Sequence, residues 1–160
     1  YMLVKKPDLI NDRRLKELDN PFMVQMSTRR VNFARQNMEL YERVFRNLCK
    51  TIKGLHDAGG TIVAGTDSPI LPYGFSLHVE LETYVQAGLT PYQALRTATF
   101  NAANAIGVGD DLGTIEVGKL ADLVILNSDP LKDIANAKDV RTVIKNGEVY
   151  AFEDLFKRPE

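Results

Sequence analysis

The sequence predicts an α/β fold in two regions, a mainly helical region over residues 1–106 and a β-rich region over residues 107–160. Two observations predict it. A long amphipathic stretch is followed at once by a short apolar run of the kind that forms a strand covered on both faces, and this order is half of an α/β repeat. After residue 106 the hydrophobic pattern changes from helical to β spacing, so we place the boundary there.

The amphipathic stretch covers residues 28–58 and predicts one long helix. Apolar residues recur every three or four positions from Val31 to Leu55, with charged and amide side chains between them. A straight helix of this length would exceed about 40 Å, so we expect a bend or fraying near Gly54. The chain before residue 21 has short apolar pieces broken by proline and charge, which indicates a loop-rich lead-in.

The apolar run "TIVAG" at residues 61–65 predicts a buried strand of a parallel sheet, and the chain reaches Asp67 directly after it. A carboxylate at the end of a buried strand is costly unless a positive partner faces it. An aspartate followed by Ser-Pro is also a common turn or N-cap arrangement, in which the carboxylate caps the next turn. The spacing alone leaves both interpretations open.

Two further helices are expected after this strand. The first begins near Ser76 and is closed by Gly88. The second has Thr90 as its N-cap, Pro91 at its first position and Gln93 completing a capping box, and it is expected to continue through the alanine-rich stretch to Gly107.

The β-rich region begins with "LGTIEVGKLADLVILN" at residues 112–127, which predicts two β segments around a turn at Gly118 and Lys119. We expect Lys119 to be structural and exposed to solvent. Residues 140–152, "VRTVIKNGEVYAF", predict a hairpin, because Asn146-Gly147 is a preferred pair for a two-residue type I′ turn.

Composition excludes several classes of partner. The net charge is −1, from 20 basic and 21 acidic residues, which gives no reason to expect nucleic acid or an anionic membrane as a partner. The apolar runs are too short to span a bilayer. The single cysteine, Cys49, rules out an intrachain disulfide and favours a reducing, cytoplasmic compartment. A periplasmic or secreted location stays open, because we expect the chain, which starts at Tyr1, to be part of a longer protein.

Four stretches in order, "AGTDSP", "LHVELETYVQAGLTPYQALRTATFNAANAIG", "LGTIEVGKLADLVILNSDPLKDI" and "VIKNGEVY", resemble the C-terminal part of amidohydrolase superfamily enzymes. The resemblance is to the imidazolonepropionase-like and prolidase-like branch and covers roughly residues 40–150. It implies a (β/α)8 TIM-like barrel with a metal centre at its mouth and a small β-sandwich. By this resemblance residues 61–65 are the last barrel strand, residues 76–106 are the closing helices, and residues 112–150 are C-terminal strands of the sandwich.

The resemblance implies a metal-dependent hydrolase that cleaves C–N bonds of an amide, a cyclic amide or a dipeptide. Asp67 would bind a divalent metal, zinc as one or two ions, and act as general base toward a metal-bound water. Ser68 and His78 would contact the substrate. Each residue also has a structural alternative. The Ser68 hydroxyl could donate a hydrogen bond to the Asp67 carboxylate, and His78 could form a hydrogen bond at the start of a helix. Glu80 is then either the partner of His78 or a favourable charge in the first turn of that helix.

Enzymes of this family bring several histidine ligands, whereas this sequence has only His56 and His78, and neither forms His-X-His. His56 and Cys49 share a helix face, but two ligands without a third do not make a metal site. We therefore expect the remaining ligands in a missing N-terminal barrel portion. The chain alone is then expected to be inactive, and to need that portion or to form a homo-oligomer. The alternatives are an esterase, lactonase or deaminase of the same fold, or a non-catalytic, barrel-derived structural or oligomerisation module.

Overall fold

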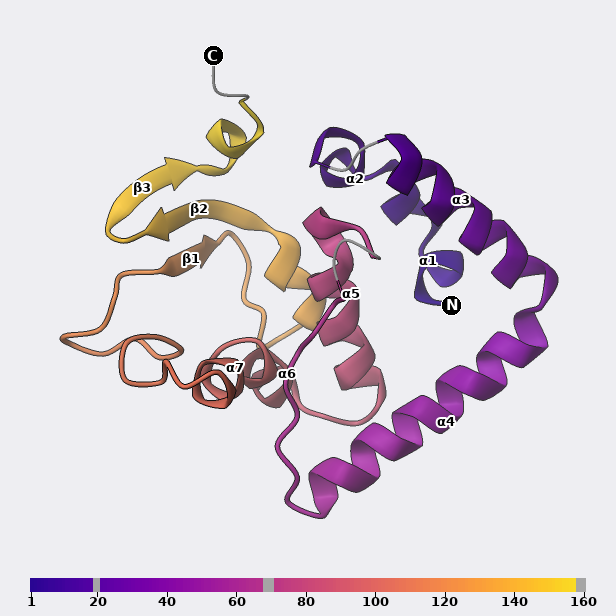
Figure 1. Ribbon diagram of the computed structural model, residues 1–160, viewed down its shortest axis with the longest axis horizontal. Coiled ribbons are helices and arrows are strands. Elements are labelled where there is room, and N and C mark those ends of the chain that lie inside the picture. Colours follow the sequence, from indigo (N-terminus) through magenta and orange to yellow (C-terminus); the bar gives the residue numbers. More distant parts are fainter. Residues whose placement is uncertain (19–20, 68–70, 158–160) are drawn as a thin grey trace.

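The computed structural model describes residues 1–18, 21–67 and 71–157 as a mixed structure in which helices come first and a small sheet follows (Figure 1). The sheet is three-stranded and antiparallel. The last α-helix of the chain, α7 (Phe100–Ala105), is followed by Gly107 with φ of 77°. The change from helix to sheet therefore follows the change in hydrophobic period.

The first residues form short helices, so the prediction of a loop-rich lead-in is wrong. They are α1 (Met2–Lys5), the 3-10 helix η1 (Pro7–Asn11) and α2 (Arg13–Leu18). Leu9 and Leu15 are buried against Phe75 of α5 (Tyr73–Gln86). Each short apolar piece is stabilised by this long-range contact, which local propensity does not reveal.

The predicted long helix is divided into α3 (Pro21–Gln36) and α4 (Met38–Asp57), which meet at a corner in Figure 1. The break lies at Asn37 and not near Gly54. The Asn37 side chain donates a hydrogen bond to the carbonyl oxygen of Phe33 at 2.8 Å. An asparagine that bonds its own helix in this way competes with the regular backbone ladder.

Helices α5, α6 (Pro91–Thr97) and α7 form the helical body beside the sheet. The end of α5 at Gly88 is confirmed: Gly88 has φ of 105°, and the Leu89 amide donates to the Tyr84 carbonyl at 3.1 Å. The capping box between Thr90 and Gln93 is also confirmed. The expected single helix from residue 91 to 106 is interrupted between α6 and α7. The main core cluster of this helical body consists of Leu81, Tyr84, Leu89, Ala94, Ile134 and Ala137.

The sheet contains β1 (Leu123–Leu126), β2 (Val140–Lys145) and β3 (Glu148–Ala151), in that order. The predicted hairpin is confirmed, because Val143 pairs with Tyr150 and both Asn146 and Gly147 have positive φ, 50° and 84°. The 3-10 helices η2 (Ile134–Lys138) and η3 (Phe152–Phe156) precede β2 and follow β3.

The segment before Gly118 is not a strand, so only one of the two predicted β segments in residues 112–127 forms. Gly118 has φ of 94°, as a turn requires. Lys119 is not exposed as expected: its side chain is 15% exposed and donates hydrogen bonds to the Gly109 carbonyl at 2.7 Å and the Thr114 hydroxyl at 2.6 Å. The lysine thus holds together the loop that precedes the sheet.

Candidate active site

Residues 61–67 lead to the predicted site and run along helices α5, α6 and α7. Exposure alternates along this segment: residues 61, 63, 65 and 67 are exposed, and residues 62, 64 and 66 are half-buried. A period of two is typical of extended backbone. Ile62 and Ala64 pack on the helical core. Asp67, at the end of this segment, is exposed like Thr61 and Val63.

The segment was predicted to be a strand, but no strand of the described residues pairs with it. Helices supply the hydrogen bonds instead. Asn101 Nδ2 donates to the Ile62 carbonyl at 2.9 Å, and the Ala64 amide donates to the Thr97 carbonyl at 3.0 Å. The Gly65 amide donates to the Glu80 carboxylate at 2.9 Å. Strand pairing requires a neighbouring strand, and the described part of this chain offers the segment none.

Asp67 is exposed and has φ of 55°, in the left-handed region that few residues other than glycine adopt. Aspartate tolerates this region better than most residues, because its short polar side chain can bond locally. The Asp67 carbonyl oxygen accepts a hydrogen bond from the Leu71 amide at 3.3 Å. The alternative role of Asp67, capping the turn at residues 68–70, concerns residues outside the described part of the chain.

The other two predicted site residues are Ser68 and His78. Ser68 is outside the described residues. His78 lies on α5, and its Nδ1 is buried without a hydrogen-bond partner in the part of the chain described here. Burial first, and then the positive charge of Arg14, lower the pKa of His78 to about 4. His78 is therefore neutral at pH 7.

Glu80 is not the partner of His78, and because α5 begins at Tyr73 it is not in the helix's first turn. Its Oε1 accepts hydrogen bonds from the Gly65 amide at 2.9 Å and from the Tyr84 hydroxyl at 2.5 Å. Burial raises the pKa of Tyr84, and the hydrogen bond to Glu80 and its charge raise it further, so the hydroxyl stays protonated. Sequence reasoning missed this Glu80–Tyr84 pair, although a spacing of four on one helix was the signal available.

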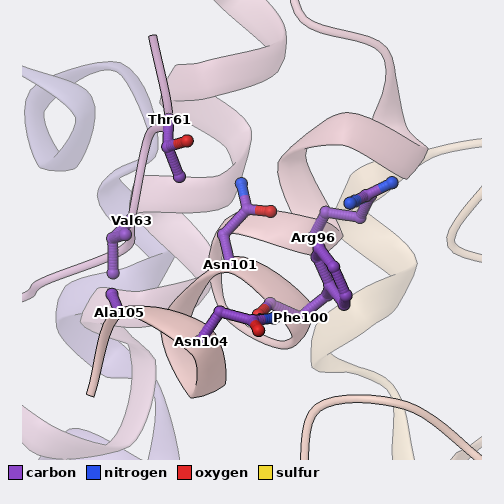
Figure 2. Close-up of a pocket in the computed structure, with 7 residues that line it drawn as sticks. All are labelled: Thr61, Val63, Arg96, Phe100, Asn101, Asn104 and Ala105. Atoms are coloured by element: carbon purple, nitrogen blue, oxygen red, sulfur yellow. The ribbon is translucent and has the colours of Figure 1, made fainter. Parts of the chain in front are cut away.

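Two cavities border the segment on different sides. One, of about 580 Å³, lies between α4 and α5 and is mostly apolar, with Glu80, Tyr84 and Thr66 among its polar lining. The other has a volume of about 540 Å³ and is shown in Figure 2. It is lined by Thr61, Val63, Arg96, Phe100, Asn101, Asn104 and Ala105. Here the guanidinium carbon of Arg96 lies 4.3 Å from the centre of the Phe100 ring. Asp67 lines neither cavity.

The described residues do not by themselves fit a metal ion. Within residues 1–18, 21–67 and 71–157, no three His, Cys, Asp or Glu side chains come together as a metal site would require. In the same ranges no helix has both the length and the apolar content needed to cross a bilayer.

Comparison with known proteins identifies the family. The profile described as "Amidohydrolase family" matches residues 11–150, which is most of the chain. The chain belongs to the amidohydrolase family. The resemblance inferred from the sequence motifs is thereby confirmed.

Individual relatives in the amidohydrolase family agree with this assignment. The imidazolonepropionase of Geobacillus sp. (strain WCH70) is 36% identical over 101 residues, covering 58% of this chain and 23% of that protein. The ochratoxinase of Aspergillus niger is 35% identical over 112 residues, covering 69% of this chain and 22% of that protein. The structure of a Xaa-Pro dipeptidase with bound methionine in the active site aligns with a TM-score of 0.61 and 33% identity, covering 64% and 25% of the two chains. This amidohydrolase chain therefore spans about a quarter of the length of these relatives.

Proposed function

We propose that this chain is the C-terminal portion of a hydrolase that cleaves C–N bonds of amides, cyclic amides or dipeptides, with Asp67 as its general base. The observation that carries the proposal is the exposed Asp67 carboxylate at the end of a segment held by three helices, within the amidohydrolase match. Similarity to a Xaa-Pro dipeptidase supports a C–N bond as the target, because the bond of a dipeptide is of that type.

The barrel assignment is part of the same proposal. Residues 61–65 are proposed as the last strand of a (β/α)8 barrel, residues 1–106 as its C-terminal portion, and residues 107–160 as strands of a composite sandwich. The alternating exposure of residues 61–67 supports this assignment, since one face packs on helices and the other is open. The carboxyl end of a barrel strand is where active residues of this fold lie.

In the complete site a divalent metal, zinc in our proposal, would lower the pKa of a water molecule and polarise the carbonyl group. Its other ligands are proposed to lie outside this sequence, because the described residues do not form the set. Asp67 would be one of the residues that hold the metal, and its carboxylate would accept a proton from the attacking water. The water oxygen would then bond the carbonyl carbon, the C–N bond would break, and Asp67 would pass the proton to the leaving nitrogen.

Ser68 and His78 enter the proposal as candidate substrate contacts. Ser68 is adjacent to Asp67 in sequence. His78 is neutral at neutral pH, so it would act as a hydrogen-bonding group and not as a cation.

A second candidate function is a non-catalytic oligomerisation module. The exposed apolar side chains of α4 favour it, among them Leu40, Val44, Leu48 and Leu55. No residue of α4 is fully buried, which is unusual for an amphipathic helix in a complete fold.

A hybrid enzyme tests the proposal. Residues 61–150 of this chain would replace the matching part of the Geobacillus imidazolonepropionase, and hydrolysis of amide, ester and lactone substrates would be measured together with zinc content. We expect C–N hydrolysis that Asp67→Asn lowers about 100- to 10,000-fold, the range that a general base contributes. Asp110→Asn, at an exposed loop position, is the control and should change little. A fully active Asp67→Asn hybrid would contradict the role of Asp67, and a folded hybrid that binds no metal would favour the module.

A further inference from the structure

We propose that Glu80 is a positioning residue that fixes the backbone leading into Asp67. The proposal rests on the proposed function, in which Asp67 is the reacting carboxylate. Glu80 itself is 13 positions further along the chain, on α5, and is not assigned any contact with the reacting groups.

The contact that carries the inference joins Glu80 to Gly65. Glu80 Oε1 accepts the Gly65 amide at 2.9 Å and the Tyr84 hydroxyl at 2.5 Å, so one carboxylate oxygen is held from two directions. Tyr84 is in turn anchored, because its ring is buried in the helical core. Glu80 therefore presents a fixed acceptor to the segment and not a freely rotating one.

The charge of Glu80 strengthens this contact. A carboxylate that accepts a backbone N–H forms a shorter and stronger bond than a neutral acceptor does. The raised pKa of Tyr84 keeps its hydroxyl protonated, so it remains a donor to Glu80 throughout the neutral range. The pair thus acts as a stable clamp on the Gly65 amide.

The clamp lies next to a strained residue. Asp67 adopts φ of 55°, and such conformations persist only where the surrounding structure fixes them. On one side the Gly65 amide is bound by Glu80, and on the other the Asp67 carbonyl is bound by the Leu71 amide. These two hydrogen bonds bracket Asp67 and set the direction in which its backbone presents the carboxylate.

Only one oxygen of Glu80 is used for this purpose. Its Oε2 is buried and has no hydrogen-bond partner among the residues that the structure describes. Glutamine retains the oxygen acceptor and places its amide where Oε2 lies. We therefore expect Glu80→Gln to preserve the position of Asp67, and Glu80→Leu, which is similar in size and has no acceptor, to release it.

The direct test is NMR of the 160-residue chain. In Glu80→Leu we expect the Gly65 amide to exchange with solvent about tenfold faster or more, as loss of a charged hydrogen bond implies, and the backbone ¹³C shifts of Asp67 to leave the left-handed range. Glu80→Gln should keep both signals near those of the parent. Glu148→Leu is the matched control. It removes another hydrogen bond between a tyrosine and a glutamate, the 2.5 Å bond that the Tyr150 hydroxyl donates to Glu148 on the surface.

Kinetics of the hybrid enzyme supply a second readout. Glu80→Leu should lower kcat about 100-fold, as expected for a misplaced reacting group, while Glu80→Gln restores most of it. KM should change by less than about threefold, because a positioning residue does not bind substrate. A raised KM with an unchanged kcat would contradict the inference.

The outcomes separate this inference from the proposed function. If the Gly65 amide of Glu80→Leu exchanges at the parent rate, the positioning role is wrong, whatever the activity of the hybrid. The positioning role is also wrong if Gly65 exchanges faster but the backbone ¹³C shifts of Asp67 stay unchanged. If Asp67→Asn leaves the hybrid active while Glu80→Leu still displaces Asp67, the proposed function fails and the positioning contact stands. Should Glu80→Leu fail to fold, Tyr84→Phe decides. It removes the hydroxyl that bonds Glu80 at 2.5 Å and also contacts the Val63 carbonyl at 3.4 Å. Gly65 exchange should rise severalfold, and no change would refute the clamp.

Discussion

The side-chain amide of Asn101 donates a hydrogen bond to the backbone carbonyl of Ile62 at 2.9 Å and so ties α7 to the extended segment 61–67. In a sheet this carbonyl would bond a neighbouring strand. Here a side chain takes that place, which explains how the extended segment stays on the helices although none of the described strands pairs with it.

Removal of this tie should destabilise the chain. Asn101→Leu leaves the half-buried Ile62 carbonyl without its partner, so we expect the free energy of unfolding to fall by about 1–2 kcal/mol in urea denaturation. Asn104→Leu is the control, because the exposed Asn104 amide donates to the Phe100 carbonyl of its own helix and not to the segment. Its effect should stay within about 0.5 kcal/mol. Equal losses in the two variants would show that the tie contributes nothing specific.

The loop before the sheet should depend on Lys119. Lys119→Met keeps the length of the side chain but removes the donor to Gly109 and Thr114, so we expect a loss of about 1.5–3 kcal/mol in unfolding free energy. Lys132→Met, at an exposed position, is the comparison and should be nearly neutral. Chemical denaturation followed by circular dichroism measures both. A neutral Lys119→Met would mean that the lysine is only a surface residue, as its sequence context suggested.

Stability should depend on pH through His78. Burial and then the charge of Arg14 lower the pKa of His78 from 6.5 to about 4, and Asp12 and Lys138 are the other charges acting on it. Between these two values the unfolded chain binds more protons, so stability is fully present above about pH 6.5 and is lost as pH falls toward 4. The loss from this group should be about 2–3 kcal/mol.

Urea titrations between pH 4 and 7 measure this effect. His78→Gln should flatten the pH dependence. The pKa of Asp12 is itself lowered by its hydrogen bonds to Arg14, so its own titration lies below this window. A slope that survives His78→Gln would assign the pH dependence to other groups.

The isolated chain should self-associate through α4. Leu48 is 49% exposed on this helix and lines the apolar cavity between α4 and α5. Leu48→Glu places a charge on this face and should shift the chain toward monomer in analytical ultracentrifugation. Asn47→Glu adds the same charge at the neighbouring exposed position and should leave association unchanged. A parent chain that is monomeric at high concentration would refute the expectation.

Local features of the fold were predictable from the sequence. The capping box of Thr90 and Gln93 and the turn at Asn146 and Gly147 formed as expected, because their interactions lie within a few residues of one another. The family was predictable for a related reason, since the ordered motifs are properties of the chain itself. The break at Asn37 is also local, but it depends on a competition between side chain and backbone that hydrophobic spacing does not show.

The sequence by itself determined the amidohydrolase family, the helix caps, the hairpin turn and the candidacy of Asp67. Only the tertiary structure decided that residues 61–67 lie against three helices and pair with none of the described strands, that Lys119 is tied into its loop, and that Glu80 meets Gly65 and not His78. The physical reason is the distance along the chain between the interacting residues. Caps and turns are fixed by residues a few positions apart, whereas these contacts depend on where the packing of whole helices places a side chain.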